Sequence, residues 1–324
     1  MLLRKILTAI ALLLCIECAA TAETFPSRPI MLVVPLGAGG AMDVIIRTMG
    51  PKLTELLGQP MIVENKTGGG TVTAAQYVAK SVAADGYTLL VAPSGTLTTN
   101  AALYKTLPYD PIQDFVPIAL YTKVPFVLVV DPSLPINNIA DLVRYNKSGG
   151  ALSYASTGTG AVPHLATELL KSALGIEMTH VPYRGAPPAL TDVVAGHVQV
   201  TFADPSLAPP MLKDGKVRAL GVSSLSRIGI MPDVPPLAEV GVPGFEAVSW
   251  HMVVAPAGTP PDVVEKLHAA FKAVGKLPEI QERLVSMGLI PIDTPSVPEL
   301  EKFLEAEMIK WRLQVEKVGI AGSM

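Results

Sequence analysis

Short apolar runs alternate with longer amphipathic stretches along most of the chain. Ile30–Pro35 and Tyr87–Ala92 have the length and composition of buried strands. The segment between them predicts helices at Ala41–Leu57 and near Thr71–Val82. Continuous apolar strands separated by helices are typical of parallel sheets that helices cover on both faces. We therefore expect an α/β fold with mostly parallel sheets.

The same alternation continues to the end of the chain. Further strands are expected at Met61–Glu64, Phe126–Val130, Leu152–Ala155, Thr179–Tyr183, Val198–Ala203, Val217–Ser223 and His251–Ala255. Further helices are expected at Ile139–Lys147, Val162–Leu174, Pro188–Ala195, Pro261–Val274 and Pro298–Val315. The apolar stripe of the last helix and Trp250 are interpreted as packing residues.

The length of 324 residues exceeds one typical domain and suggests two lobes. We expect lobe 1 to contain residues 23–123 and 246–324, and lobe 2 to contain residues 124–245. Two similar segments, 127–135 and 252–260, each read as a strand followed by a proline-rich turn. They are interpreted as the two places where the chain crosses between the lobes.

The first 22 residues have the order of a secretory signal peptide. Arg4 and Lys5 precede the apolar run Ile6–Ile16, and Ala20–Ala22 forms a small-x-small cleavage site. The run is shorter than the roughly 20 apolar residues that a membrane span needs. We expect cleavage after Ala22 and a mature protein in the periplasm. The chain's two cysteines, at positions 15 and 18, lie in this segment and are expected to leave with it.

Composition disfavours several classes of function. The formal net charge is −3 and lysines and arginines form no run, which disfavours nucleic-acid binding. Two cysteines and five scattered histidines argue against a disulfide framework or a metal site. The serine-hydrolase elbow, the His-Glu-x-x-His zinc motif and the phosphate loop are absent from the sequence. No catalytic residue, metal or cofactor is expected.

One motif resembles a dinucleotide-binding fingerprint. The strand Ile30–Pro35 leads into Gly37-Ala38-Gly39-Gly40, and Glu64 ends the next strand. Met42 stands where the third glycine of that fingerprint belongs. A signal peptide would also take the chain away from cytoplasmic nicotinamide pools. The dinucleotide reading is therefore disfavoured.

Glycine-rich turns at strand ends indicate an anion site instead. The turns Gly37–Gly40 and Thr157–Gly160 expose backbone N–H groups, and the positive N-terminus of a helix follows each. Ser94 and Thr96 supply hydroxyls at another strand end, and Arg184-Gly185 supplies a cation and further N–H groups. We expect these segments to meet in a cleft that closes on a small anion by hinge motion.

Four charged or ionisable positions have alternative roles. Asp43 could cap its helix or touch ligand. His164 could donate to an anion or make a structural hydrogen bond, and Arg184 is favoured as a cleft residue over a surface ion pair. Asp204 would repel an anion unless it accepts a ligand hydroxyl or amine, or holds Arg184. The predicted ligand-binding set is Gly37, Ala38, Gly39, Gly40, Asp43, Ser94, Thr96, Thr157, Gly158, Gly160, His164, Arg184, Gly185 and Asp204.

A series of short motifs between Pro29 and Ile320 points to a family. The motifs include Val33-Val34-Pro35, Asp85-Gly86-Tyr87-Thr88-Leu89-Leu90, Leu107-Pro108-Tyr109-Asp110-Pro111, His180-Val181-Pro182-Tyr183 and Gly215-Lys216-Val217-Arg218-Ala219-Leu220. In this order they resemble the extracytoplasmic solute receptors of tripartite tricarboxylate transporters, also called Bug receptors. The resemblance implies a two-lobed, type II-like periplasmic binding protein with a carboxylate ligand and a membrane permease as partner, and a monomer.

The same resemblance implies which loops hold the ligand. The segments 36–40 and 156–160 would grip its two ends. The chain departs from the family at Leu36 and Gly37, where phenylalanine and proline are frequent, and at Ala161, where serine is usual. The substrate is therefore not carried over. We expect a receptor that captures a small organic carboxylate by hinge closure and delivers it to the permease; the alternatives are a ligand sensor for a signalling partner and a secreted enzyme acting on small acids.

Overall fold

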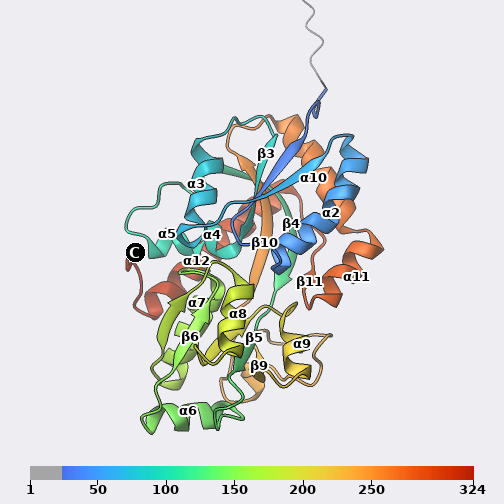
Figure 1. The fold of residues 1–324 in the computed structure, drawn as a ribbon. Helices are drawn as coiled ribbons and strands as arrows, with labels where there is room; N and C mark the ends of the chain where they lie inside the picture. Colours follow the sequence, from blue (N-terminus) through green and yellow to red (C-terminus); the bar gives the residue numbers. More distant parts are fainter. Residues whose placement is uncertain (1–23) are drawn as a thin grey trace, which may run out of the picture.

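The chain folds into two α/β lobes, each built around one sheet (Figure 1). The computed structural model describes residues 24–324, so the predicted signal peptide lies outside the described residues. The strand order is β11-β4-β10-β3-β1-β2 in the first sheet and β7-β6-β8-β5-β9 in the second. The predicted two-lobed α/β architecture is confirmed.

The first lobe holds the six-stranded sheet and the C-terminal helices. Its strands are β1 (Ile30–Val34), β2 (Met61–Asn65), β3 (Thr88–Pro93), β4 (Phe115–Val124), β10 (Ser249–Pro256) and β11 (Ile290–Pro291). Its helices are α2 (Ala41–Leu57), η1 (Gly69–Thr71), α3 (Val72–Lys80), α4 (Ser94–Leu97), α5 (Thr99–Leu103), α10 (Pro261–Gly275), α11 (Pro278–Ser286) and α12 (Val297–Lys317).

The second lobe holds the five-stranded sheet. Its strands are β5 (Val127–Val130), β6 (Ser153–Ser156), β7 (Thr179–Pro182), β8 (Val200–Ala203) and β9 (Arg218–Val222). Its helices are α6 (Ile139–Lys147), α7 (Val162–Leu174), α8 (Ala186–Val194) and α9 (Ala208–Lys213), and η2 (Leu237–Glu239) follows β9. Within the described residues, no helix combines the length and the apolar content needed to cross a bilayer.

Both sheets are mixed, which differs from the mostly parallel sheets expected. Strand β1 pairs in parallel with β2 and β3, and β6 pairs in parallel with β7 and β8. Strand β10 is antiparallel to β3 and β4, and β5 is antiparallel to β8 and β9. The antiparallel strands β5 and β10 are those that follow a change of lobe. Such a strand arrives without the helical crossover that parallel pairing requires.

The chain changes sheets twice. Strand β4 ends at Val124 in the first sheet and β5 begins at Val127 in the second, so the first crossing is residues 125–126. The return lies between Val222, the end of β9, and Ser249, the start of β10. The interpretation of segments 127–135 and 252–260 as the crossings is therefore wrong, because each follows its crossing. The exact lobe boundaries stay a prediction.

The strands in the middle of each sheet form the cores. All residues of β5, β8 and β10 are buried, whereas the edge strands β2 and β7 are partly exposed. Helix α12 packs its predicted apolar stripe inward, with Leu300, Leu304 and Trp311 buried. Trp250 packs edge-on against Phe303 of this helix, as predicted for a packing residue. Strand β10, which carries the chain back from lobe 2, is thus fixed to the C-terminal helix.

Candidate ligand site between the lobes

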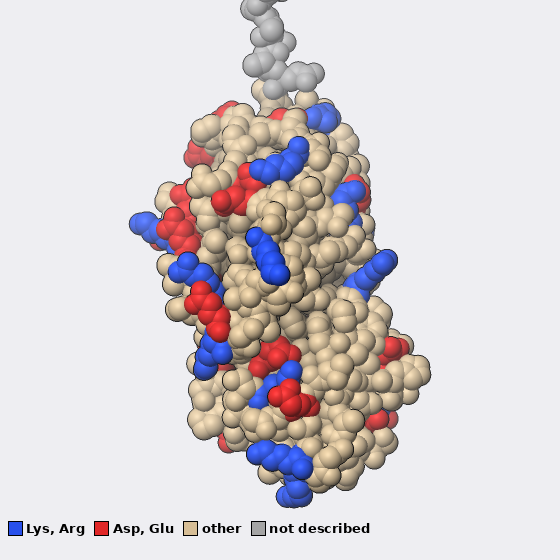
Figure 2. Space-filling model, turned by 90° about the vertical axis from the view of Figure 1, so that its left-hand side faces the viewer, with Lys and Arg blue, Asp and Glu red and all other residues tan. Residues whose placement is uncertain are grey.

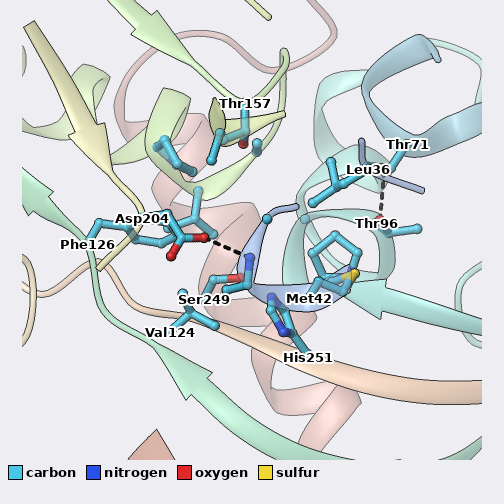
Figure 3. Close-up of a pocket in the computed structure, with 18 of the residues that line it drawn as sticks. Leu36, Met42, Thr71, Thr96, Val124, Phe126, Thr157, Asp204, Ser249 and His251 are labelled. Carbon is cyan, nitrogen blue, oxygen red and sulfur yellow. Dashed lines mark hydrogen bonds between the residues drawn. The ribbon is translucent and has the colours of Figure 1, made fainter. Parts of the chain in front are cut away.

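A pocket lies where the two lobes meet, and both lobes line it (Figure 3). The space between the atoms there is about 680 Å³, including its open mouth. The first lobe and the chain crossings contribute Leu36, Gly37, Gly40, Ala41, Met42, Asp43, Gly70, Thr71, Pro93, Gly95, Thr96, Val124, Phe126, Ser249 and His251. The second lobe contributes Thr157, Gly160, Ala161, Val162, Pro163, Ala186 and Asp204.

Four helices begin at this pocket. Helices α2, α4, α7 and α8 follow the carboxyl ends of the parallel strands β1, β3, β6 and β7, and the first turn of each contributes lining residues. In none of the four does the side chain of the N-cap residue hydrogen-bond to the first N–H groups of the helix. Unsatisfied N–H groups and the positive end of the helix dipole both favour an anion. The pocket therefore suits a small anion although no lysine or arginine lines it.

The lobes touch backbone to backbone at the pocket. A Cβ atom at Gly95 would lie 2.9 Å from the carbonyl oxygen of Gly160, and one at Gly37 would lie 3.0 Å from that of Arg184. Thr99 Oγ1 donates a hydrogen bond of 2.6 Å to the Gly160 carbonyl. Glycine allows this approach because it lacks Cβ. The structure thus shows the lobes in a closed arrangement.

Asp43 orders the glycine-rich turn before α2. Its carboxylate accepts hydrogen bonds from the Gly39 N–H (3.1 Å), Arg47 Nε (3.0 Å) and Asn65 Nδ2 (2.9 Å). Burial raises the pKa of Asp43, but these hydrogen bonds and the Arg47 charge outweigh it, so the pKa is lowered overall. Asp43 therefore supports the turn that precedes the N-cap Gly40 instead of capping α2, and it also lines the pocket.

A histidine pair orders the corresponding loop of lobe 2. The rings of His164 and His180 stack at 4.1 Å, and burial lowers the pKa of each to about 4. His164 Nδ1 accepts from the Gly160 N–H at 3.1 Å. His180 Nε2 lies 2.7 Å from Ser156 Oγ, but Ser156 is fully buried and neither residue lines the pocket. His164 and His180 thus support the loop. Ser156 and His180 do not form a nucleophile–base pair at the pocket.

Asp204 reaches the pocket from the carboxyl end of β8. Its side chain is 8% exposed, and burial raises its pKa against the opposing effect of its hydrogen bonds. Its Oδ1 accepts from the N–H and hydroxyl of Ser206 at 2.9 and 2.7 Å. Its Oδ2 accepts from the Ala41 N–H, at the start of α2, at 3.4 Å (Figure 3). The predicted interaction of Asp204 with Arg184 is not formed, because the hydrogen bonds of Asp204 are to Ala41 and Ser206.

The predicted site residues occupy three places. Gly37, Gly40, Asp43, Thr96, Thr157, Gly160 and Asp204 line the pocket. Gly158 and Arg184 line a neighbouring hollow, where Arg184 is exposed. The remaining five, Ala38, Gly39, Ser94, His164 and Gly185, line neither hollow; Ser94, for example, bonds to the hydroxyl of Ser249 at 2.9 Å. Ligand contact by any of them stays a prediction.

Sequence reasoning missed most of the apolar wall and three polar side chains, of which Thr71 is one. Val124 ends β4, Phe126 lies in the first crossing and Ser249 begins β10, while Met42 follows the first glycine turn. His251 was missed as well; its side chain is 5% exposed and its Nδ1 has no hydrogen-bond partner. Burial lowers the pKa of His251 to about 3, so the ring is neutral near pH 7. The sequence placed His251 only at the start of a predicted strand, His251–Ala255, and offered no sign that it faces the pocket.

Charge and metal-ligand patterns add two observations. Acidic and basic side chains are interspersed on the face shown in Figure 2, without a broad patch of one sign. That face lacks the basic stripe of a nucleic-acid binder. Within residues 24–324, histidine and acidic side chains form no group of three or more that could hold a metal ion.

Comparisons with known proteins place the chain in a family. The family model described as the tripartite tricarboxylate transporter family receptor matches residues 45–320. BugT of Bordetella pertussis is 34% identical over 94% of this chain and 93% of BugT. A Rhodopseudomonas palustris protein solved with adipate has a TM-score of 0.87 and is 36% identical, over 92% of this chain and 99% of that chain.

A second solved structure agrees. MatC from Rhodopseudomonas palustris, with bound malate, has a TM-score of 0.84 and is 34% identical, over 90% of this chain and all of that chain. The family is one of substrate-binding receptors and not of enzymes. The predicted resemblance is thus confirmed: the chain belongs to the tripartite tricarboxylate transporter family receptors.

Proposed function

We propose that this protein is a periplasmic receptor that captures a small organic carboxylate between its lobes and delivers it to a tripartite tricarboxylate-type permease. The observation that carries the proposal is the convergence of the N-termini of α2, α7 and α8 on one pocket between the lobes, none of them with a hydrogen bond from its N-cap side chain. That arrangement suits a carboxylate because the N–H groups bind oxygen and the helix dipoles favour negative charge. Binding of adipate and malate by two relatives supports the same ligand class.

Capture proceeds by closure of the two lobes. The loops at Gly37–Gly40 and Thr157–Gly160 come from different lobes and meet in the closed arrangement. An anion held between them gains contacts that neither lobe provides alone, so ligand shifts the population toward the closed form. The permease would recognise that form. The predicted signal peptide supports a periplasmic location.

Ligand-dependent thermal unfolding tests the proposal. The protein without residues 1–22 is unfolded and refolded to remove carried-over ligand, then heated with about 1 mM of each member of a carboxylate library. A ligand with a micromolar Kd stabilises it by about 4 kcal/mol, and Tm rises on the order of several degrees. Amides of the same acids, which lack the charge, serve as controls and leave Tm unchanged. If no carboxylate raises Tm of the natively folded protein, the proposal fails.

Uptake tests the delivery step. A strain that lacks the receptor loses uptake of the acid found in the library screen, and the full-length gene restores it. If uptake is unchanged and only a transcriptional response to the acid disappears, the protein is a sensor and the delivery step is refuted.

A further inference from the structure

Asp204 is a buried acid in a pocket proposed to bind an anion. Its Oδ1 is satisfied by the two donors of Ser206. Its Oδ2 has a single partner, the Ala41 N–H, at 3.4 Å, which is long for an N–H···O hydrogen bond. A carboxylate has about four acceptor sites, so Oδ2 retains capacity for a further donor. Oδ2 of Asp204 therefore lacks a second hydrogen-bond donor.

No positive side chain at the pocket compensates this acid. Asp43 is the other acid on the wall, and Arg47 pairs with it at 3.0 Å. His251 on β10 is neutral because burial lowers its pKa to about 3. Figure 3 shows Asp204, Ser249 and His251 grouped on one side of the pocket, away from Leu36 and Thr71. A ligand carboxylate placed on this side would face a buried acid, which is unfavourable without a hydrogen between them.

We propose that the ligand carries an N–H or O–H donor in addition to its carboxylate, and that Asp204 selects for this donor. The proposal rests on the proposed function and narrows its substrate class to amino- or hydroxy-substituted carboxylates. The carboxylate binds at the helix N-termini, and the donor lies against Oδ2 of Asp204. A plain di-acid of the same length leaves Oδ2 without that partner.

Matched ligands test the proposal with the wild-type protein alone. Dissociation constants are measured by titration calorimetry at pH 7 for succinate, malate and aspartate, for glutarate, 2-hydroxyglutarate and glutamate, and for adipate and 2-aminoadipate. In the series that binds most tightly, we expect a substituted acid to bind at least about tenfold more tightly than the plain one, since a hydrogen bond to a buried charged group is worth that much. Equal or tighter binding of the plain acid overturns the proposal while the receptor function stands. If no acid of any series binds, both fail.

The variant Asp204→Asn assigns the selection to this residue. Asparagine keeps an oxygen for Ser206 but presents an NH₂ group to the pocket, so the preference for the substituted acid is expected to fall at least about tenfold. Asp233→Asn is the matched control: Asp233 is exposed and lies outside the pocket, so this variant keeps the wild-type preference. Unfolding without ligand verifies that each variant is folded. Retention of the full preference by a folded Asp204→Asn protein overturns the assignment.

A measurement of proton uptake on binding separates donor binding from protonation of Asp204. Binding of a plain acid that depends on Asp204 taking up a proton would tighten steadily as the pH falls, with measurable proton uptake in buffers of different ionisation enthalpy. Binding of the substituted acid is expected to involve no such uptake between pH 6.5 and 8. Uptake of one proton with the preferred ligand overturns the proposed donor contact.

Discussion

Replacing Gly95 with alanine tests whether the lobes close as the structure shows. Gly95 lies in α4, and its backbone φ is not positive, so alanine fits the local conformation. Alanine is favoured over glycine in a helix by up to about 1 kcal/mol. In the closed arrangement, however, the new Cβ would lie 2.9 Å from the Gly160 carbonyl oxygen. Within the first lobe the new Cβ meets Thr99 Oγ1 at 3.3 Å, at the end of a side chain that can rotate. The substitution therefore penalises mainly the closed form.

The magnitude follows from the contact. The obstructing atom is backbone, so a lobe must shift by a few tenths of an ångström and the Thr99–Gly160 hydrogen bond of 2.6 Å is strained. Overpacking of this kind costs about 1–3 kcal/mol. Ligand affinity is then expected to fall by about 5- to 150-fold.

Calorimetric titration measures the affinity, and thermal unfolding without ligand measures the stability. Gly275→Ala is the control, because Gly275 ends helix α10 and a Cβ there meets no atom within 4 Å. We expect this control to bind as the wild type does. Wild-type affinity in Gly95→Ala would refute closure through the Gly95–Gly160 contact.

Three further predictions concern the helix N-terminus, the buried histidines and the C-terminal helix. Gly40→Asp places an acid at the extended N-cap of α2, where its carboxylate competes with the ligand for the helix N–H groups. Ligand affinity is expected to fall at least about tenfold, while Tm without ligand stays the same or rises. The control Gly40→Ala is expected to keep most of the affinity. Burial lowers the pKa of His164 to about 4 in the folded protein, against about 6.5 in the unfolded chain. The unfolded state therefore takes up the proton first, and the stability of the folded state falls as the pH drops from 6.5 to 4. Tm measured over this pH range is expected to fall less in His164→Asn than in the wild type, and an equal fall would contradict this. Glu307 accepts from both indole N–H groups, of Trp250 at 2.8 Å and of Trp311 at 3.0 Å, so Glu307→Ala leaves two donors unpaired and lowers stability by about 2–4 kcal/mol in a denaturant titration. The exposed Glu305 on the same helix is the control, and an equal loss in Glu305→Ala would refute the assignment.

Much of the fold could be predicted because helical periodicity and glycine or proline punctuation agree. Helices α2, α6 and α7 have the predicted bounds. Strand β4 was missed although it has ten residues, since Pro117 argues against a central strand. In the structure Pro117 pairs with Val254 at an irregularity in the register, which accommodates a residue without an N–H.

The site could be predicted only where local sequence determines it. The turns Gly37–Gly40 and Thr157–Gly160 follow strands, and their backbone N–H groups are usable whatever the side chains are. Phe126 and His251 reach the pocket from segments placed by the packing of the two lobes, which no periodicity reveals. Arg184 lies two residues beyond the end of β7, in the loop before α8, and its side chain lies at the neighbouring hollow.

The position of β10 has a consequence for the order in which the chain can fold as it emerges from its N-terminus onward. The five strands of the second sheet all lie between residues 127 and 222, so that sheet can be completed early. The first sheet has no strand between β3 and β4 until residues 249–256 have emerged. The N-terminal third of the chain therefore waits with two open strand edges while the middle third folds. Ser249 and His251 of β10 line the pocket between the lobes, so that pocket is completed only after the last quarter of the chain has emerged.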